Sequence, residues 1–251
     1  MTENRFLGLT LSAWTGFVLG IASASACWAA VGLNLGLFFG GIIAASLLTP
    51  PLTLGEKRLI ERYLVAGAVV DGIAVIWLAA VFGQQVTLSQ WALCYVILIA
   101  WSFALCGLTM LILRTVCLFH LARRENTPGD PRSVDRGLND KSQNPSVNPT
   151  LSDSTVSSAI VVVLAMLWLS WPIWLSQINT PVLISAHPLF AINGMLRNFG
   201  AWPERPIAYR YLMRLGQDLP YTLPRNIGPM IAVHLLIGAI GLIAGYTAGK
   251  R

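Results

Sequence analysis

An uncharged run near the start of the chain limits what this sequence can fold into. Residues 6–48 contain no Asp, Glu, Lys or Arg over 43 positions. A helix rises 1.5 Å per residue and needs about 20 apolar residues to cross roughly 30 Å of hydrocarbon. The run is therefore long enough for two membrane-spanning helices. We expect the break within residues 27–32, where Trp28 marks a membrane interface.

Four further apolar segments follow, at residues 64–83, 91–113, 156–176 and 229–247. The 251 residues are 55% hydrophobic and 11% charged, whereas an average soluble domain has about 25% charged residues. This composition excludes a water-soluble globular protein. The sequence predicts an all-α polytopic membrane protein with six transmembrane helices. With so few charges, the net charge of +6 concerns topology, and we expect no nucleic-acid partner.

The basic residues favour one orientation, because Lys and Arg in short loops resist translocation. With a cytoplasmic N-terminus, 12 of the 17 basic residues lie on the inner face, and the other 5 lie in one long outer loop. We expect a multi-pass protein of the cell inner membrane with both termini cytoplasmic. Arg5 and the small residues before Cys27 also resemble a lipoprotein signal peptide, but Glu3 and the continuing apolar run favour an uncleaved hairpin.

The segments outside the membrane differ in composition. Helices one to four occupy residues 1–124 and the last two helices, with the loop between them, occupy residues 156–251. The segment between these two parts, residues 125–155, is rich in Ser, Asn, Asp and Pro and has no aromatic residue, which predicts a disordered cytoplasmic linker. The outer loop, residues 179–228, is predicted to be ordered. Its apolar residues recur at helical spacing in two sets, which predicts two short amphipathic helices at the outer interface: Leu189, Ile192, Leu196 and Phe199, then Ile207, Tyr211, Leu215 and Leu219.

Asp71 is the one acidic residue inside a predicted span. A carboxylate within the membrane is a functional-site hypothesis by default, because exposing its charge to lipid is costly. The structural alternative is a hydrogen bond to Ser102 or Thr109 on the antiparallel fourth span. The sequence leaves both interpretations open.

Two histidines, His187 and His234, both fall near the predicted outer face. Their predicted positions would allow the two histidines to share a metal ion or a haem. Two histidines without the spacing of metal ligands do not predict such a site, and we expect no metal and no cofactor. A catalytic centre is not expected either, since no H-E-x-x-H or G-x-S-x-G signature occurs. An enzyme acting at the outer interface would have these candidate site residues: His187, Glu204, Arg205, Tyr209, Arg210, Asp218 and His234.

Glycines recur every four residues in the first two helices, at Gly16 and Gly20 and again at Gly36 and Gly40. Such stripes allow close helix approach. They predict that the first two helices pack tightly against each other or against a second subunit. The four cysteines lack C-x-x-C spacing and are interpreted as small buried hydrophobes.

The connection after the second span reads Leu-Leu-Thr-Pro-Pro-Leu-Thr-Leu-Gly-Glu-Lys-Arg over residues 47–58 and leads into a third helix opening at Tyr63. It resembles the cytoplasmic stretch of ABC-2-type export permeases, a small-Pro-Leu/Val-Ser/Thr-x-x-Glu run that docks on the partner ATPase. Residues 187–192, His-Pro-Leu-Phe-Ala-Ile, are similar to the Asn-Pro-Leu-type segment after the fifth helix of that family. The family pattern explains neither Asp71 nor the long linker.

The resemblance implies a dimeric channel wall driven by a separate nucleotide-binding subunit, with Glu56, Lys57 and Arg58 as partner-docking residues. An ordinary positively charged inner loop is the alternative interpretation of these three residues. We therefore expect a permease-type transporter subunit that contacts lipid and an ATPase and belongs to an oligomer or complex. The alternatives are a structural or assembly subunit of a larger membrane complex and an intramembrane enzyme at the outer interface.

Overall fold

The computed structural model describes residues 3–31, 33–54, 59–83, 86–125, 151–174, 181–198 and 223–248. These residues form eight helices and no strand, which confirms the predicted all-α class. The helices are α1 (Glu3–Val31), α2 (Leu33–Leu54), α3 (Leu59–Phe82), α4 (Leu88–Glu125), α5 (Leu151–Trp174), α6 (Pro181–Ala186), α7 (Pro188–Asn198) and α9 (Gly228–Ala248).

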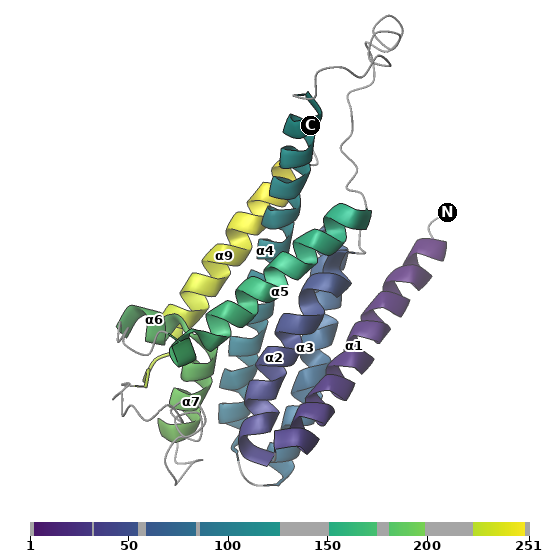
Figure 1. Ribbon diagram of the computed structural model, residues 1–251. Helices are drawn as coiled ribbons and strands as arrows, with labels where there is room; N and C mark the ends of the chain where they lie inside the picture. The colour runs from purple at the N-terminus through teal and green to yellow at the C-terminus, as the bar shows by residue number, and fades with distance from the viewer. Residues whose placement is uncertain are drawn as a thin grey trace, which may run out of the picture.

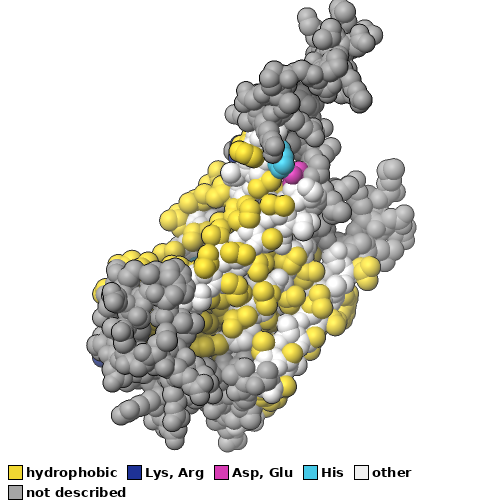
Figure 2. Space-filling view, viewed as in Figure 1, with side chains coloured by type: hydrophobic (Ala, Val, Ile, Leu, Met, Phe, Trp, Pro, Cys, Tyr) yellow, Lys and Arg dark blue, Asp and Glu magenta, His cyan; other side chains and the backbone are white. Residues whose placement is uncertain are grey.

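Six of these helices, α1 to α5 and α9, are long and apolar enough to cross a membrane. The chain is therefore a multi-pass integral membrane protein, as the apolar segments predict. Figure 1 shows α1 beginning and α9 ending at the same end of the bundle, while α6 and α7 lie at the opposite end. Apolar side chains cover the length of the face in Figure 2, and its histidine and acidic side chains appear only at the upper end.

The first helix ends at Val31 and the second begins at Leu33, so the first helix ends inside the predicted range. The connection between the second and third spans is shorter than predicted, because α2 continues through Pro50 and Pro51 to Leu54. A membrane helix tolerates proline where hydroxyl groups and neighbouring helices satisfy the backbone. Here the Thr53 hydroxyl donates to the carbonyls of Thr49 (2.9 Å) and Pro50 (3.2 Å).

The fourth helix extends twelve residues beyond its predicted end at residue 113. Its start is fixed by a capping box, in which Thr87 N donates to Gln90 Oε1 at 2.7 Å and Gln90 N donates to Thr87 Oγ1 at 3.3 Å. The fifth helix begins at Leu151, so the predicted linker loses its last five residues to α5. Residues 126–150 lie outside the described residues.

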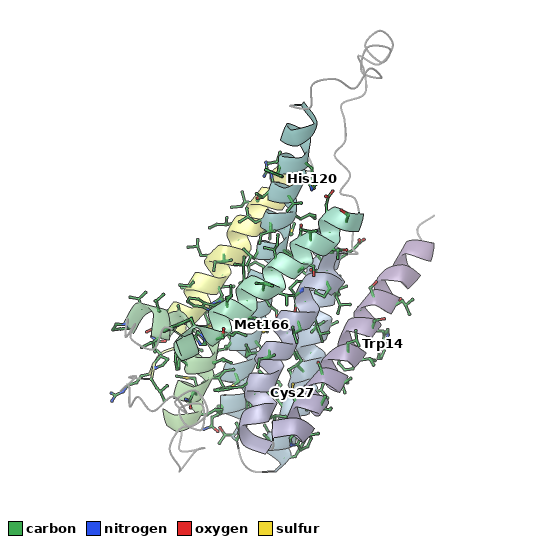
Figure 3. All side chains as sticks on the ribbon, in the orientation of Figure 1. Trp14, Cys27, His120 and Met166 are labelled. Atoms are coloured by element: carbon green, nitrogen blue, oxygen red, sulfur yellow. The ribbon has the colours of Figure 1, made fainter. Side chains whose placement is uncertain are left out.

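The core of the bundle combines large apolar side chains with close backbone contacts. Trp77 and Phe38 are fully buried with ring centroids 4.9 Å apart, and Trp77 Nε1 donates to the Leu37 carbonyl at 2.7 Å. On the outside of the bundle, Trp14 is 65% exposed and points away from the other helices (Figure 3), and Leu11 is also exposed. An apolar exterior around a packed core is the arrangement that a lipid environment requires.

The first two helices contact each other, as the glycine stripes predict, but the stripe of α1 lies against a third helix. A Cβ on Gly20 would lie 2.5 Å from the Val69 carbonyl and 3.3 Å from Gly72 Cα, so the stripe of α1 contacts α3 rather than α2. Within the described part of the second stripe, Gly40 contacts the first helix at Cys27, which is labelled in Figure 3. The first helix reaches both neighbours because its small residues are distributed around it.

A second glycine contact joins α4 to α9, and the spacing of glycines in the sequence does not predict it. A Cβ on Gly107 would lie 2.7 Å from Gly238 Cα, and Gly241 lies directly against the Gly107 backbone. No side chain separates the two helices at this crossing, so the backbones of α4 and α9 touch.

The predicted short helix over residues 189–199 exists as α7. It does not have an exposed polar face, because every residue from Pro188 to Leu196 is buried. Leu189, Ile192 and Leu196 join the main core. This helix is therefore built into the end of the bundle, against α4 and α2. The second predicted outer helix, over residues 207–219, lies outside the described residues.

Candidate functional site

The carboxylate of Asp71 lies at the middle of a spanning helix and on its outer surface. The candidate span of α3 is Ile60–Phe82, so Asp71 has eleven residues of the span on either side. Its side chain is exposed rather than buried among the other helices. Insertion scales put the cost of an Asp at a helix centre facing lipid at about 2.5–3.5 kcal/mol.

One hydrogen bond holds this carboxylate. Tyr95 on α4 donates its hydroxyl to Asp71 Oδ1 at 2.6 Å. The phenol ring stacks on Trp91, with centroids 5.3 Å apart and planes 6° apart, and Trp91 Nε1 donates to the Ala74 carbonyl at 3.2 Å. The α3–α4 pair therefore fixes the orientation of Tyr95 before any partner is present. A membrane hydrogen bond contributes about 0.6 kcal/mol on average, which is less than the cost of exposing the carboxylate to lipid.

The alternative partners predicted for Asp71, Ser102 and Thr109, are wrong. Thr109 Oγ1 donates to the Leu105 carbonyl at 2.7 Å, and buried Ser102 has no hydrogen-bond partner in the described part of the chain. The antiparallel register explains this result. Ser102 lies seven residues beyond Tyr95, which is about 10 Å further along α4. The sequence correctly predicted that the partner of Asp71 lies on the fourth span. It could not predict the register of that span relative to the third.

His187 lies at the junction of α6 and α7. Pro188 occupies the first position of α7, where its missing N–H costs nothing, and the His187 carbonyl accepts from Ala191 N at 3.0 Å. The imidazole is 1% exposed, and its Nε2–H donates to the Trp168 carbonyl on α5 at 3.1 Å. Burial lowers the pKa of His187 to about 3, with a smaller lowering from His234, and the hydrogen bond to Trp168 opposes the shift.

Four rings surround this junction and form an aromatic cluster of His187, Trp168, Trp171 and Phe190. Ring centroids lie 4.9 Å apart for His187 and Phe190, and 5.7 Å apart for His187 and Trp168. Three buried polar atoms here have no hydrogen-bond partner among the described residues: Trp168 Nε1, Trp171 Nε1 and His187 Nδ1. The cluster offers two donors and one acceptor in an apolar setting, and it fixes the α6–α7 pair to α5.

His234 occupies a separate position on α9. Its side chain is 2% exposed, and its Nδ1–H donates to the Met230 carbonyl at 2.7 Å. Its ring meets Trp101 edge-on at 5.1 Å, and Trp101 Nε1 donates to Ser46 Oγ at 2.9 Å. Among the described residues there is no group of three or more His, Cys, Asp or Glu that could hold a metal ion. His187 and His234 are therefore packed within separate aromatic contacts.

Other predicted site residues lie outside the described residues: Glu204, Arg205, Tyr209, Arg210 and Asp218 of the outer loop, and Glu56, Lys57 and Arg58 of the inner connection. All four cysteines are free. At the upper end of the bundle, His120, labelled in Figure 3, lies 3.4 Å from the Asp153 carboxylate and joins α4 to α5.

The partners of the predicted residues were missed by sequence reasoning. Tyr95 and Trp91 are four residues apart and so share a helix face, a spacing that was visible in the sequence. Trp168 and Trp171 are three residues apart in the same way. Their connection to Asp71 and to His187 depends on helix register, which spacing alone does not define.

Comparisons with models of known protein families, with curated proteins and with solved structures find no match.

Proposed function

We propose that this integral membrane protein is the membrane-spanning, permease-type subunit of a transporter driven by a separate ATPase. The observation that carries the proposal is the α6–α7 pair. The segment resembling the permease family, His187 to Ile192, begins a helix that is buried in the end of the bundle and fixed to α5. A surface loop without a structural role would not need this degree of burial. Six candidate spans with the α6–α7 pair between the last two fit the topology that the resemblance implies.

The inner connection supports the same proposal. Only four residues, 55–58, separate the end of α2 from the start of α3, and three of them are Glu56, Lys57 and Arg58. A short charged connection between two packed helices is a compact docking element for a protein outside the membrane. In the proposed function these three side chains contact the ATPase.

A second function, a structural or assembly subunit of a larger membrane complex, is favoured by the exposed carboxylate of Asp71. A charge at this depth is costly against lipid, and contact with another protein removes that cost. The two functions differ in whether an ATPase binds.

Purification in mild detergent from the native membrane tests the proposal. We expect an ATPase to co-purify with the tagged chain, and we expect the triple variant Glu56→Ala, Lys57→Ala, Arg58→Ala to lose it. The matched control is Arg123→Ala, Arg124→Ala, Glu125→Ala, which removes the same charges at the end of α4 and should retain the ATPase. Absence of an ATPase, or its equal retention by both triple variants, would contradict the permease function and leave the assembly function.

A further inference from the structure

One face of the α3–α4 pair combines an acidic group with exposed apolar side chains. We call it the Asp71 face, and it comprises Leu64, Gly67, Asp71 and Val75 of α3 with Val96 and Ile99 of α4. The large apolar members are exposed by 41–51%. No other spanning helix has a carboxylate exposed at the middle of its candidate span in the described part of the chain.

The carboxylate is only partly satisfied. A carboxylate can accept about four hydrogen bonds, and the described residues give Asp71 one, from Tyr95. Tyr95 is held in place by its stack on Trp91, so the second oxygen, Oδ2, remains available in a fixed direction. A cationic side chain is the partner that best complements a carboxylate in a low-dielectric medium.

The shape of the face allows a helix to approach. Gly67 lies one turn before Asp71, and a Cβ built on it would meet no atom within 4 Å. By contrast, Gly72, about 100° round the same helix from Asp71, lies against the backbone of α1. Small residues at an open position let a second backbone come close in a membrane. The space over Gly67 is therefore beside the acidic group.

A second copy of this chain does not supply the cation. A two-fold contact through this face would set Asp71 against Asp71, and like charges repel. The six candidate spans contain two Lys or Arg residues, Arg62 and Arg114. Arg62 is about 13 Å along the helix from Asp71, and Arg114 donates to the Ala244 carbonyl on α9 at 2.8 Å.

We propose that the Asp71 face docks a transmembrane helix of a different protein, which carries a Lys, Arg or His at the middle of its span. The carboxylate and the Tyr95 hydroxyl bind the basic side chain, and Gly67 admits the helix backbone. This partner goes beyond the proposed function, since the ATPase contacts the chain outside the membrane. Loss of one partner leaves binding of the other unchanged.

Synthetic transmembrane peptides test the proposal directly. Fluorescence transfer in lipid vesicles would measure binding of the labelled full chain to a Leu/Ala helix of about 20 residues with one central Lys. Peptides with a central Leu, or with the Lys moved two turns towards one end, are the controls. We expect the central Lys to strengthen binding about 5- to 30-fold over the central Leu. Equal binding of all three peptides would overturn the proposal.

Three variants separate charge from shape. Asp71→Asn should abolish the preference for the central Lys, and Gly67→Leu should weaken binding of the Lys peptide while leaving the fold intact. Ile243→Leu, at an exposed apolar position of α9, should change neither. The proposal would be overturned if Asp71→Asn still preferred the central-Lys peptide over the central-Leu peptide. It would also be overturned if two labelled copies of the chain showed fluorescence transfer to each other and Asp71→Asn abolished that transfer. Co-purification of an ATPase should be unaffected by Asp71→Asn, which distinguishes this inference from the proposed function.

Discussion

At the scale of single residues, His187 joins three elements through one side chain. Its backbone ends α6 and starts α7, and its ring binds α5 through the Trp168 carbonyl. The contact with α5 needs a hydrogen on Nε2, which one neutral tautomer of the imidazole supplies. A protonated ring would place a charge among three other aromatic rings, where burial makes it costly.

The depressed pKa of His187 predicts a pH-dependent stability. The folded protein keeps this imidazole neutral down to about pH 3, whereas an exposed imidazole takes up a proton below about pH 6.5. The unfolded state then binds more protons, so stability falls as the pH drops from 6.5 towards 3, by at most about 1.4 kcal/mol per pH unit. Thermal unfolding in detergent would measure this effect. The stability advantage of the wild type over His187→Gln should shrink between pH 7 and pH 4; parallel loss in both proteins would contradict the assignment.

The candidate site also shows what single residues reveal before a structure exists. Asp71 stands out because an acidic residue in an apolar span is rare and costly, and its depth follows from counting. Tyr95 does not stand out, because a tyrosine in a membrane helix needs no explanation. Its role depends on a rotation and a register of α4 relative to α3 that many packing contacts determine together.

At the scale of elements, the crossing of α4 and α9 depends on the absence of side chains. Gly107 and Gly241 lie backbone to backbone, and Gly238 lies against the ring of Phe103. Because backbone atoms on both sides cannot move independently, this contact tolerates no added volume.

Adding one methyl group tests this contact. Gly241→Ala should lower the free energy of unfolding by about 1–3 kcal/mol, since its Cβ would overlap the Gly107 backbone. Gly67→Ala is the control, because its Cβ meets open space and alanine favours the helix by up to about 1 kcal/mol. Denaturation in detergent of the two variants beside the wild type provides the measurement. Equal destabilisation by both would show that the effect does not depend on the contact between α4 and α9.

Elements were predicted with uneven success for physical reasons. The six spans follow from apolar length, because the bilayer sets a minimum that the sequence must meet. The extension of α2 through Pro50 and Pro51 was not predicted, because in water two prolines normally end a helix. The burial of α7 was not predicted either, since its small and apolar residues fit an interface and a packed core equally well.

At the scale of the whole molecule, the placement of charges predicts the orientation. Both ends of the described bundle lie on one side (Figure 1), as an even number of spans requires, and the predicted orientation assigns 12 basic residues to the inner face. A fluorescent protein that matures only in the cytoplasm should fluoresce when fused after residue 251. The same fusion after residue 200, in the outer loop, should remain dark. The reverse pattern would invert the topology.

The length of α4 sets a condition on the membrane around it. Its 38 residues extend about 57 Å, nearly twice the roughly 30 Å of hydrocarbon in a typical bilayer. Its candidate span alone covers 33 residues, so tilting, local thickening of the bilayer or projection from it must absorb the mismatch. The backbone contact at Gly107 ties α9 to this helix, so a change in the tilt of α4 also moves α9. Lipid thickness thereby becomes a variable that acts on the whole bundle, with thicker bilayers favouring a more upright α4–α9 pair.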